Sequence, residues 1–297
     1  MRFVSVFAAF VAALVSILLI FGCYKEQTAI ENNGGLDDVK KRAETYRTEI
    51  DALQNRIEDL KKQRTEATNT LNTLQNRENY KTKPTAFLTF DGGFTTSTEE
   101  ILEILNDNGL KGTFFIVGKN LKDSEALRSA VKKAAEQGHR IGIRSYSDDL
   151  SEIYASEDAY FEDLYACRDL IQEITGTAPV LVRMPAGTAT AEVRFEKYTG
   201  SKETLQKVLT RLESEGFMVN DWSVDTETAT QSDIDTIVEN AEKGGARMLK
   251  ATYKTCVVLF TDNGRAVKAL PRVISVLKQQ GYEFSSLPEG ICITRQR

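Results

Sequence analysis

The sequence has very little histidine: one residue among 297, with four cysteines and a single tryptophan. One imidazole cannot build a site that needs two or three histidines from one chain, and most catalytic zinc sites are of that kind. So few cysteines also exclude a small fold held together by a disulfide framework. Basic residues are not in excess, since the net charge is -5. The sequence therefore predicts no binding of nucleic acid.

A long uncharged run opens the chain. From Phe3 to Gly22 no residue carries a charge, and about twenty residues at about 1.5 Å each span the hydrocarbon core of a bilayer. Residues 1–24 are therefore predicted to be a membrane anchor or signal segment, followed by a linker over residues 25–35. Because Arg2 lies on the N-terminal flank, the expected location is the cell membrane, with the globular domain extracytoplasmic.

The processing of this segment has three alternatives. Cys23 follows Ile20-Phe21-Gly22, which resembles a bacterial lipoprotein processing site, although Phe21 is bulky where that pattern prefers a small residue. The run is also long for a signal core, which favours an uncleaved anchor over lipid modification of Cys23 or plain secretion. All three place the rest of the chain outside the cytoplasm.

A heptad pattern occupies residues 36–80, which contain neither proline nor glycine. Eleven of the twelve a and d positions are apolar or aromatic. The a positions are Leu36, Ala43, Ile50, Ile57, Arg64 and Leu71, and the d positions are Val39, Tyr46, Leu53, Leu60, Ala67 and Leu74. This pattern predicts a coiled-coil stalk. The alternative is a lone amphipathic helix that lies on the following domain.

Mostly basic residues flank this seam. The e and g positions carry Lys40, Arg42, Arg47, Arg56 and Lys61 against a single acid, Glu49. In a parallel homodimer two basic pairs would face each other, and each costs a few tenths of a kcal/mol at an exposed site. The expected partner is therefore a coiled-coil helix with acidic flanks.

From Lys81 onward, short apolar runs alternate with helical stretches, a pattern typical of β-α units around a parallel sheet or barrel. Seven strands are predicted, centred on residues 86–90, 113–117, 140–143, 180–183, 217–222, 256–260 and 282–285. The predicted fold class is α/β: residues 81–297 form a distorted seven-stranded (β/α) barrel, preceded by a transmembrane helix and a coiled-coil helix.

Charged, polar and aromatic residues follow the strands of this barrel, at the carboxyl edge where barrel enzymes place their chemistry. They are Asp91, Arg144, Asp148, Arg183, Trp222, Asp225, Thr261 and Asp262. Two glycines after Asp91 allow a ligand or a neighbouring backbone to come close. The pattern predicts a polar pocket at the barrel mouth, and the alternative is a set of ordinary polar residues that solvate it.

From Thr85 to about Leu287 the chain resembles the polysaccharide deacetylase family, the NodB-like carbohydrate esterases. The motifs that carry the resemblance lie at residues 86–118, 138–142, 183–187, 222–225, 257–262 and 266–284. The resemblance implies a metal-dependent hydrolase that removes acetyl groups from N-acetylated glycans, on a distorted barrel with seven strands.

Some positions of the family's site are kept and one ligand is lost in the first motif. Asp91 matches the general base of the family, but Gly92 stands where a metal-binding aspartate is found. Arg183 matches the residue that orients the base, and the region of Asp225 is also kept. The resemblance therefore covers the scaffold more securely than the chemistry.

The remaining positions are replaced. Arg144 and Asp148 stand at the family's two metal-binding histidines, and Thr261 stands at its acid histidine. A guanidinium has no lone pair and stays protonated, so Arg144 cannot bind a metal. Thr261 does not titrate in the useful range and cannot replace the proton donor. His139 precedes its strand, so we expect it at the far end of the barrel in a structural role.

No metal or other cofactor is therefore expected, and without a metal no water is activated near neutral pH. We expect Arg144 to stand in for the metal's charge and to hold Asp91 and Asp148 ionised through direct hydrogen bonds. The predicted function is that of a membrane-anchored, catalytically inactive deacetylase-like protein that binds a cell-wall or N-acetylated glycan or assembles a complex.

Two alternatives stay open. One is an active glycan N-deacetylase in which Asp91, Asp148, Asp225 and Asp262 hold a hard cation such as Mg²⁺ or Ca²⁺. The other makes the barrel a structural cap and the stalk the working part. Two side chains are also undecided: Trp222 stacks on a sugar ring or belongs to the core, and Cys256 either pairs with Cys292 or, as is favoured, stays unpaired.

Overall fold

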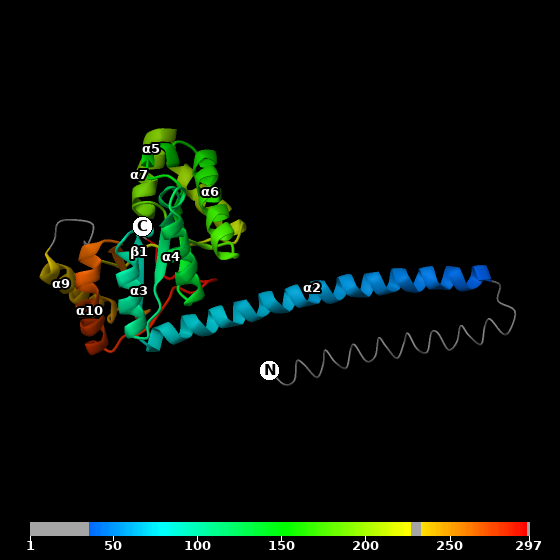
Figure 1. Ribbon diagram of the computed structural model, residues 1–297, viewed down its shortest axis with the longest axis horizontal. Coiled ribbons are helices and arrows are strands. Elements are labelled where there is room, and N and C mark those ends of the chain that lie inside the picture. Colours follow the sequence, from blue (N-terminus) through cyan, green and yellow to red (C-terminus); the bar gives the residue numbers. More distant parts are fainter. Residues whose placement is uncertain (1–35, 227–232, 296–297) are drawn as a thin grey trace. The chain divides into compact units, whose positions relative to one another are not determined.

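The structure, a computed structural model, describes residues 36–226 and 233–295, with some side chains of the first helix left out (Figure 1). The predicted membrane segment, the linker and Cys23 lie outside the described residues. Among those that are described, no helix is both long enough and apolar enough to cross a membrane. The chain divides into two compact units, residues 1–69 and 70–297.

Helix α2, Leu36–Thr82, is continuous and covers the whole of the segment predicted to be helical. The boundary between the two units falls inside it, so its last turns belong to the second unit. There the Tyr80 ring meets the Phe87 ring edge-on at a centroid distance of 5.7 Å. The Tyr80 carbonyl also accepts a hydrogen bond from the Lys254 N–H at 2.7 Å. The end of α2 is thus joined to the base of the barrel.

Eight parallel strands form the sheet of the second unit, counting only residues that the structure describes. The strands are β1 Thr85–Asp91, β2 Thr113–Val117, β3 Arg140–Ser145, β4 Leu181–Val182, β5 Met218–Val219, β6 Val224–Asp225, β7 Thr255–Thr261 and β8 Glu283–Ser285. Their order is β5-β4-β3-β2-β1-β7-β6, and β8 pairs with the first half of β1. The α/β class and the parallel, barrel-like sheet are confirmed.

The single strand expected over residues 217–222 is wrong. The structure has two short strands instead, β5 paired with β4 and β6 paired with β7, at opposite edges of the sheet. Between them, the Asn220 N–H donates to the Val182 carbonyl and the Ser223 N–H donates to the Val257 carbonyl. Four residues thus carry the chain from one edge to the other. The strand breaks because Asn220 and Asp221 are fully buried polar residues whose carbonyls serve another side chain.

Helices cover the outer face of the sheet (Figure 1). They are α3 Thr98–Asp107, α4 Glu125–Glu136, α5 Leu150–Ile153, α6 Glu157–Thr175, α7 Thr188–Thr199, α8 Glu203–Ser214, α9 Ile234–Met248 and α10 Gly264–Gln279, with a 3-10 turn at Gly118–Leu121. Alternation along β1 turns Ala86, Leu88 and Phe90 toward these helices, where they join the main apolar core. The opposite face of each strand lines the inside of the barrel.

A second apolar cluster fills the inside of the barrel. It consists of Phe87, Phe115, Leu181, Val257 and Leu287, with Trp222 and Ile293 packed against it. Because strand residues alternate, the residues two positions beyond these on each strand also face inward, closer to the carboxyl edge. A layer of apolar side chains, the floor of the barrel, therefore lies directly beneath the expected site.

Two of the smaller expectations are confirmed. Cys256 and Cys292 are free, and Cys256 is buried, which raises its pKa to about 12. His139 is buried at the start of β3, at the end away from the mouth. Its Nδ1 accepts a hydrogen bond from the Gly112 N–H at 3.0 Å. Burial, with a smaller contribution from Lys111, lowers the pKa of His139 to about 4.

A titration of this single histidine by NMR is expected to give a pKa near 4 in the folded chain, against about 6.5 in an unfolded peptide. The folded state favours the neutral ring, so its stabilisation is complete above pH 6.5 and is lost as the pH falls toward 4. That loss is about 3 kcal/mol. A folded-state pKa at or above 6 contradicts this prediction, and His139→Gln supplies the control by removing the titrating group.

Candidate functional site

A buried arginine forms the base of the mouth. Arg183 directly follows β4 and faces inward, two residues beyond Leu181, and its side chain is 0% exposed. Its carbon Cζ lies 4.1 Å from the centre of the Phe115 ring and 5.7 Å from that of Trp222. The guanidinium therefore rests on the apolar floor of the barrel and can turn its donors only toward the walls and the mouth.

Every nitrogen of this guanidinium donates a hydrogen bond. Nε donates to the carbonyl of Asn220 at 2.9 Å, and Nη2 donates to the carbonyl of Asp221 at 2.8 Å. Nη1 donates to Thr89 Oγ1 and to Asp91 Oδ1, both at 2.8 Å. Bonds from a charged donor are stronger than neutral ones. Arg183, which follows β4, thus connects β1 to residues 220–223, the segment that leads from β5 to β6.

Asp91 ends β1, and its side chain is 14% exposed. It pairs with Thr261 in the register of β1 and β7, so the two face the mouth side by side. The next residues, Gly92 and Gly93, have φ values of 101° and 59°. A Cβ on Gly93 would lie 2.4 Å from the backbone nitrogen of Val117, so only glycine fits there. The chain turns away sharply and leaves the carboxylate open toward the mouth.

Arg144 and Asp148 meet at the carboxyl end of β3, which lies two strands from β1 in the sheet. Arg144 Nη1 donates to Asp148 Oδ1 at 3.0 Å, and the two side chains are 20% and 55% exposed. Among the described residues, the ion pair of Asp91 is with Arg183, and none is formed between Asp91 and Arg144. The expected hydrogen bond from Arg144 to Asp148 is present, whereas the expected bond from Arg144 to Asp91 is wrong, because Arg183 occupies Asp91 instead.

A residue of α6 holds the loop that carries this pair. The carboxylate of Asp163 accepts hydrogen bonds from the backbone N–H groups of Tyr146 and Ser147, both at 2.7 Å. Burial raises the pKa of Asp163, and these two bonds oppose the increase. Asp163 therefore fixes the backbone between Arg144 and Asp148.

The donors at the mouth do not fit a metal ion. Gly92 offers no side chain, Arg144 is a cation, and Asp148 already accepts from that cation. Within residues 36–226 and 233–295, no group of three or more His, Cys, Asp or Glu side chains is placed to hold a metal. The four carboxylates of the alternative site are therefore not brought together.

The expectation that Asp262 lines the pocket at the mouth is wrong. Its side chain is 3% exposed and accepts from the hydroxyls of Thr95 and Thr98 and from the Thr95 N–H. Burial raises its pKa, and these bonds oppose the increase. Asp262 thus anchors the start of α3, because its side chain points outward past the end of β7. Asp225, by contrast, is exposed at the end of β6.

Three residues of the site were missed in the sequence. The Thr89 hydroxyl accepts from Arg183 and donates to the Val258 carbonyl. Thr89 lies two residues before Asp91 on the same strand, so strand alternation could have predicted that it faces inward as well. Asp221 is fully buried, and its carboxylate accepts from the N–H and the hydroxyl of Thr188 at the start of α7. Neither Asp221 nor Asp163 carries a local signal, because their partners are distant in sequence.

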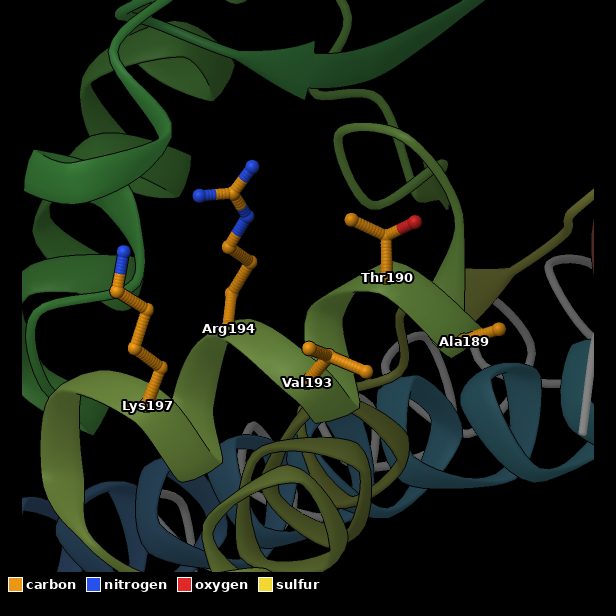
Figure 2. A pocket seen from close by; sticks show the side chains of 5 residues that line it. All are labelled: Ala189, Thr190, Val193, Arg194 and Lys197. Atoms are coloured by element: carbon orange, nitrogen blue, oxygen red, sulfur yellow. The ribbon is translucent and has the colours of Figure 1, made fainter.

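A hollow of about 420 Å³ lies on α7, the helix that begins directly after the loop leaving β4. Its lining is Ala189, Thr190, Val193, Arg194 and Lys197. Figure 2 shows the long side chains of Arg194 and Lys197 extending to the same side as Thr190. The hollow does not include the Asp91 carboxylate. It adds a basic surface along the helix that follows Arg183.

Comparisons with known proteins agree with this architecture. The family model described as polysaccharide deacetylase matches residues 78–202. A peptidoglycan-N-acetylglucosamine deacetylase from Bacillus cereus is 30% identical over 217 residues, covering 71% of this chain and 69% of its own.

Solved structures share the fold. The catalytic domain of the peptidoglycan N-acetylglucosamine deacetylase from Eubacterium rectale superimposes with a TM-score of 0.63 at 24% identity, covering 72% of this chain and 93% of its own. A family pseudoenzyme from Bacillus anthracis gives a TM-score of 0.54 at 21% identity, covering 69% and 64%. A mutant of that pseudoenzyme has restored enzymatic activity. With its barrel, its strand-end motifs and these relatives, the chain belongs to the polysaccharide deacetylase family.

Proposed function

We propose that the barrel binds an N-acetylated cell-wall glycan and does not hydrolyse it. The observation that carries the proposal is the Arg144 to Asp148 ion pair, which occupies two positions where the family holds its metal. Deacetylation in the family needs that metal to activate water and to stabilise the oxyanion. A guanidinium paired to a carboxylate supplies neither a nucleophile nor an open coordination position.

The retained half of the mouth supports glycan binding. Asp91 is held by Arg183, and its carboxylate faces the mouth as a hydrogen-bond acceptor for hydroxyl or amide groups. Trp222 packs against the apolar floor with its ring centre 5.7 Å from Arg183 Cζ, and it is partly exposed, which leaves part of the ring for stacking on the apolar face of a sugar. A relative named for peptidoglycan N-acetylglucosamine deacetylation supports an N-acetylated glycan as the ligand. The existence of a pseudoenzyme with the same fold is compatible with lost hydrolysis.

The proposal includes a location. The uncharged run from Phe3 to Gly22 has the length and composition of a membrane anchor. With Arg2 on its cytoplasmic side, this anchor places the barrel in the compartment that holds the cell wall. A barrel that binds glycan there tethers the wall to the membrane, or positions a complex on it.

Two assays with the purified full-length chain test this function. Acetate release from N-acetylglucosamine oligomers and from peptidoglycan is expected to equal that of the Asp91→Ala variant. Binding to a labelled N-acetylglucosamine tetramer is expected to persist and to weaken about tenfold in Trp222→Ala, the loss typical of one aromatic stacking contact. Tyr253→Ala is the matched control, because Tyr253 is an exposed aromatic that precedes β7 at the opposite end.

Turnover that is measurable in the parent chain and lost in Asp91→Ala overturns the inactive assignment. Equal binding by the parent and Trp222→Ala removes the mouth as the glycan site.

A further inference from the structure

Helix α2 carries an apolar seam whose large side chains are exposed in the part of the chain that the structure describes. Five large side chains of its a and d positions are exposed: Tyr46 by 49%, Leu53 by 61%, Ile57 by 39%, Leu60 by 49% and Leu71 by 54%. All five lie on the single stripe defined by the heptad pattern, and not around the helix. An apolar stripe of this regularity on a helix of 47 residues is the surface that a second helix covers.

The charges beside the seam restrict what that second helix is. Three of the flanking cations have a counter-ion on their own helix: Arg42 with Asp38 at 3.5 Å, Arg56 with Asp59 at 3.2 Å and Lys61 with Glu58 at 3.1 Å. These acids occupy outer positions of the heptad, on the side away from a partner. Every side chain in these pairs is at least 49% exposed. Such pairs are weak and exchange readily for partners across an interface.

Lys40 and Arg47 form no ion pair with any residue that the structure describes. Both occupy e positions, beside Tyr46 and the start of the seam. Two unpaired cations at the edge of an apolar stripe favour carboxylates on the opposing helix. They repel an identical helix, which would present its own cations there.

Arg64, inside the seam, also disfavours pairing with an identical helix. Arg64 occupies an a position and is exposed. In a parallel pair of identical chains, two Arg64 guanidinium groups would face each other in the middle of the interface, with no acid between them. A partner with an acid at the matching position would instead form a buried ion pair. A single polar residue at an a position commonly fixes register and partner in this manner.

We propose that α2 binds a separate helical segment whose e and g positions carry Asp or Glu, with an acid opposite Arg64. This pairing, and not a second copy of the chain, covers the seam. The inference rests on the helix alone and is independent of glycan binding by the barrel.

The test uses the full-length chain and two synthetic helical probes of about five heptads. Both probes have Ile at a and Leu at d. One carries Glu at e, at g and opposite Arg64, and the other carries Lys at those positions. Fluorescence anisotropy is expected to show at least about tenfold tighter binding of the Glu probe at low salt, with the difference shrinking near 1 M salt as screening increases.

Matched variants separate the seam from the general charge of the chain. Arg47→Glu is expected to weaken the Glu probe about three- to tenfold, because one attraction becomes a repulsion. Lys41→Glu makes the same charge change at an outer f position and is expected to leave the affinity within about twofold. Leu53→Asp places a carboxylate in the seam and is expected to abolish binding of both probes.

Three results overturn the proposal. The first is equal affinity for the two probes, and the second is failure of both to bind. The third is a dimer of the full-length chain at moderate salt, seen by sedimentation, that Leu53→Asp abolishes and the Glu probe does not displace.

Discussion

Replacement of Arg183 by Met is expected to lower the free energy of unfolding by about 3 to 5 kcal/mol, the usual cost of removing one member of a buried ion pair. The guanidinium is fully buried, and it bonds Asp91, Thr89 and two backbone carbonyls. Methionine fills a similar volume above Phe115 but leaves these acceptors without a donor, which is the larger part of the loss. Urea unfolding monitored by circular dichroism measures the change.

Arg144→Met is the matched control for this substitution. Arg144 lies at the same mouth but is 20% exposed and pairs with a carboxylate that is 55% exposed. Its loss is expected to cost about 1 kcal/mol or less. Equal costs for Arg144→Met and Arg183→Met contradict the assignment of Arg183 as the central tie of the barrel. Arg183→Lys keeps the charge with fewer donors, so its cost is expected to fall between the two.

A variant with Gly92→Asp, Arg144→His and Asp148→His is expected to bind about one zinc ion per chain, since three protein ligands and a water form the usual open site. The parent chain is expected to retain none. Positions 144 and 148 already converge, because Arg144 Nη1 and Asp148 Oδ1 are 3.0 Å apart. Metal analysis after dialysis gives the stoichiometry without any dependence on activity.

Backbone strain from an aspartate at position 92 is not expected to prevent zinc binding by the triple variant. Its φ of 101° disfavours aspartate by about 1 to 3 kcal/mol, and coordination of zinc by three protein ligands is expected to exceed that cost. Space is also present, because a Cβ there meets nothing closer than Thr261 Cγ2 at 3.6 Å. The Arg144→His, Asp148→His double variant is the control and is expected to lose zinc on dialysis. A folded triple variant without zinc shows that these positions do not correspond to the family's ligands.

Much of the barrel was predictable because its strands are short, apolar and separated by helical patterns. β1, β2, β3 and β7 lie where the hydrophobic runs placed them. The same runs located Asp91 and Arg183 at the carboxyl edge, and strand alternation then turned both inward. Arg144 was expected to bond Asp148 because both stand at positions that resemble the family's metal-binding histidines, and the two side chains are hydrogen-bonded.

The rest depended on contacts between distant segments. The split of the strand over residues 217–222 follows from the use of the Asn220 and Asp221 carbonyls by Arg183, which lies 37 and 38 positions earlier. Asp262 was placed at the mouth by its position after β7, yet Thr95 and Thr98 draw its side chain to α3. Periodicity describes the faces of one element and says nothing about such partners.

The segment between β5 and β6 is also held by residues near the end of the sequence. The Asp221 N–H donates to the Thr294 carbonyl at 2.9 Å, and the Ile293 N–H donates to the side chain of Asn220. Asn220 and Asp221, whose carbonyls accept from Arg183, therefore gain two of their hydrogen bonds only when residues 293 and 294 are in place. The last residues that the structure describes therefore complete the support of the Arg183 guanidinium, although they lie more than a hundred positions after it in the sequence.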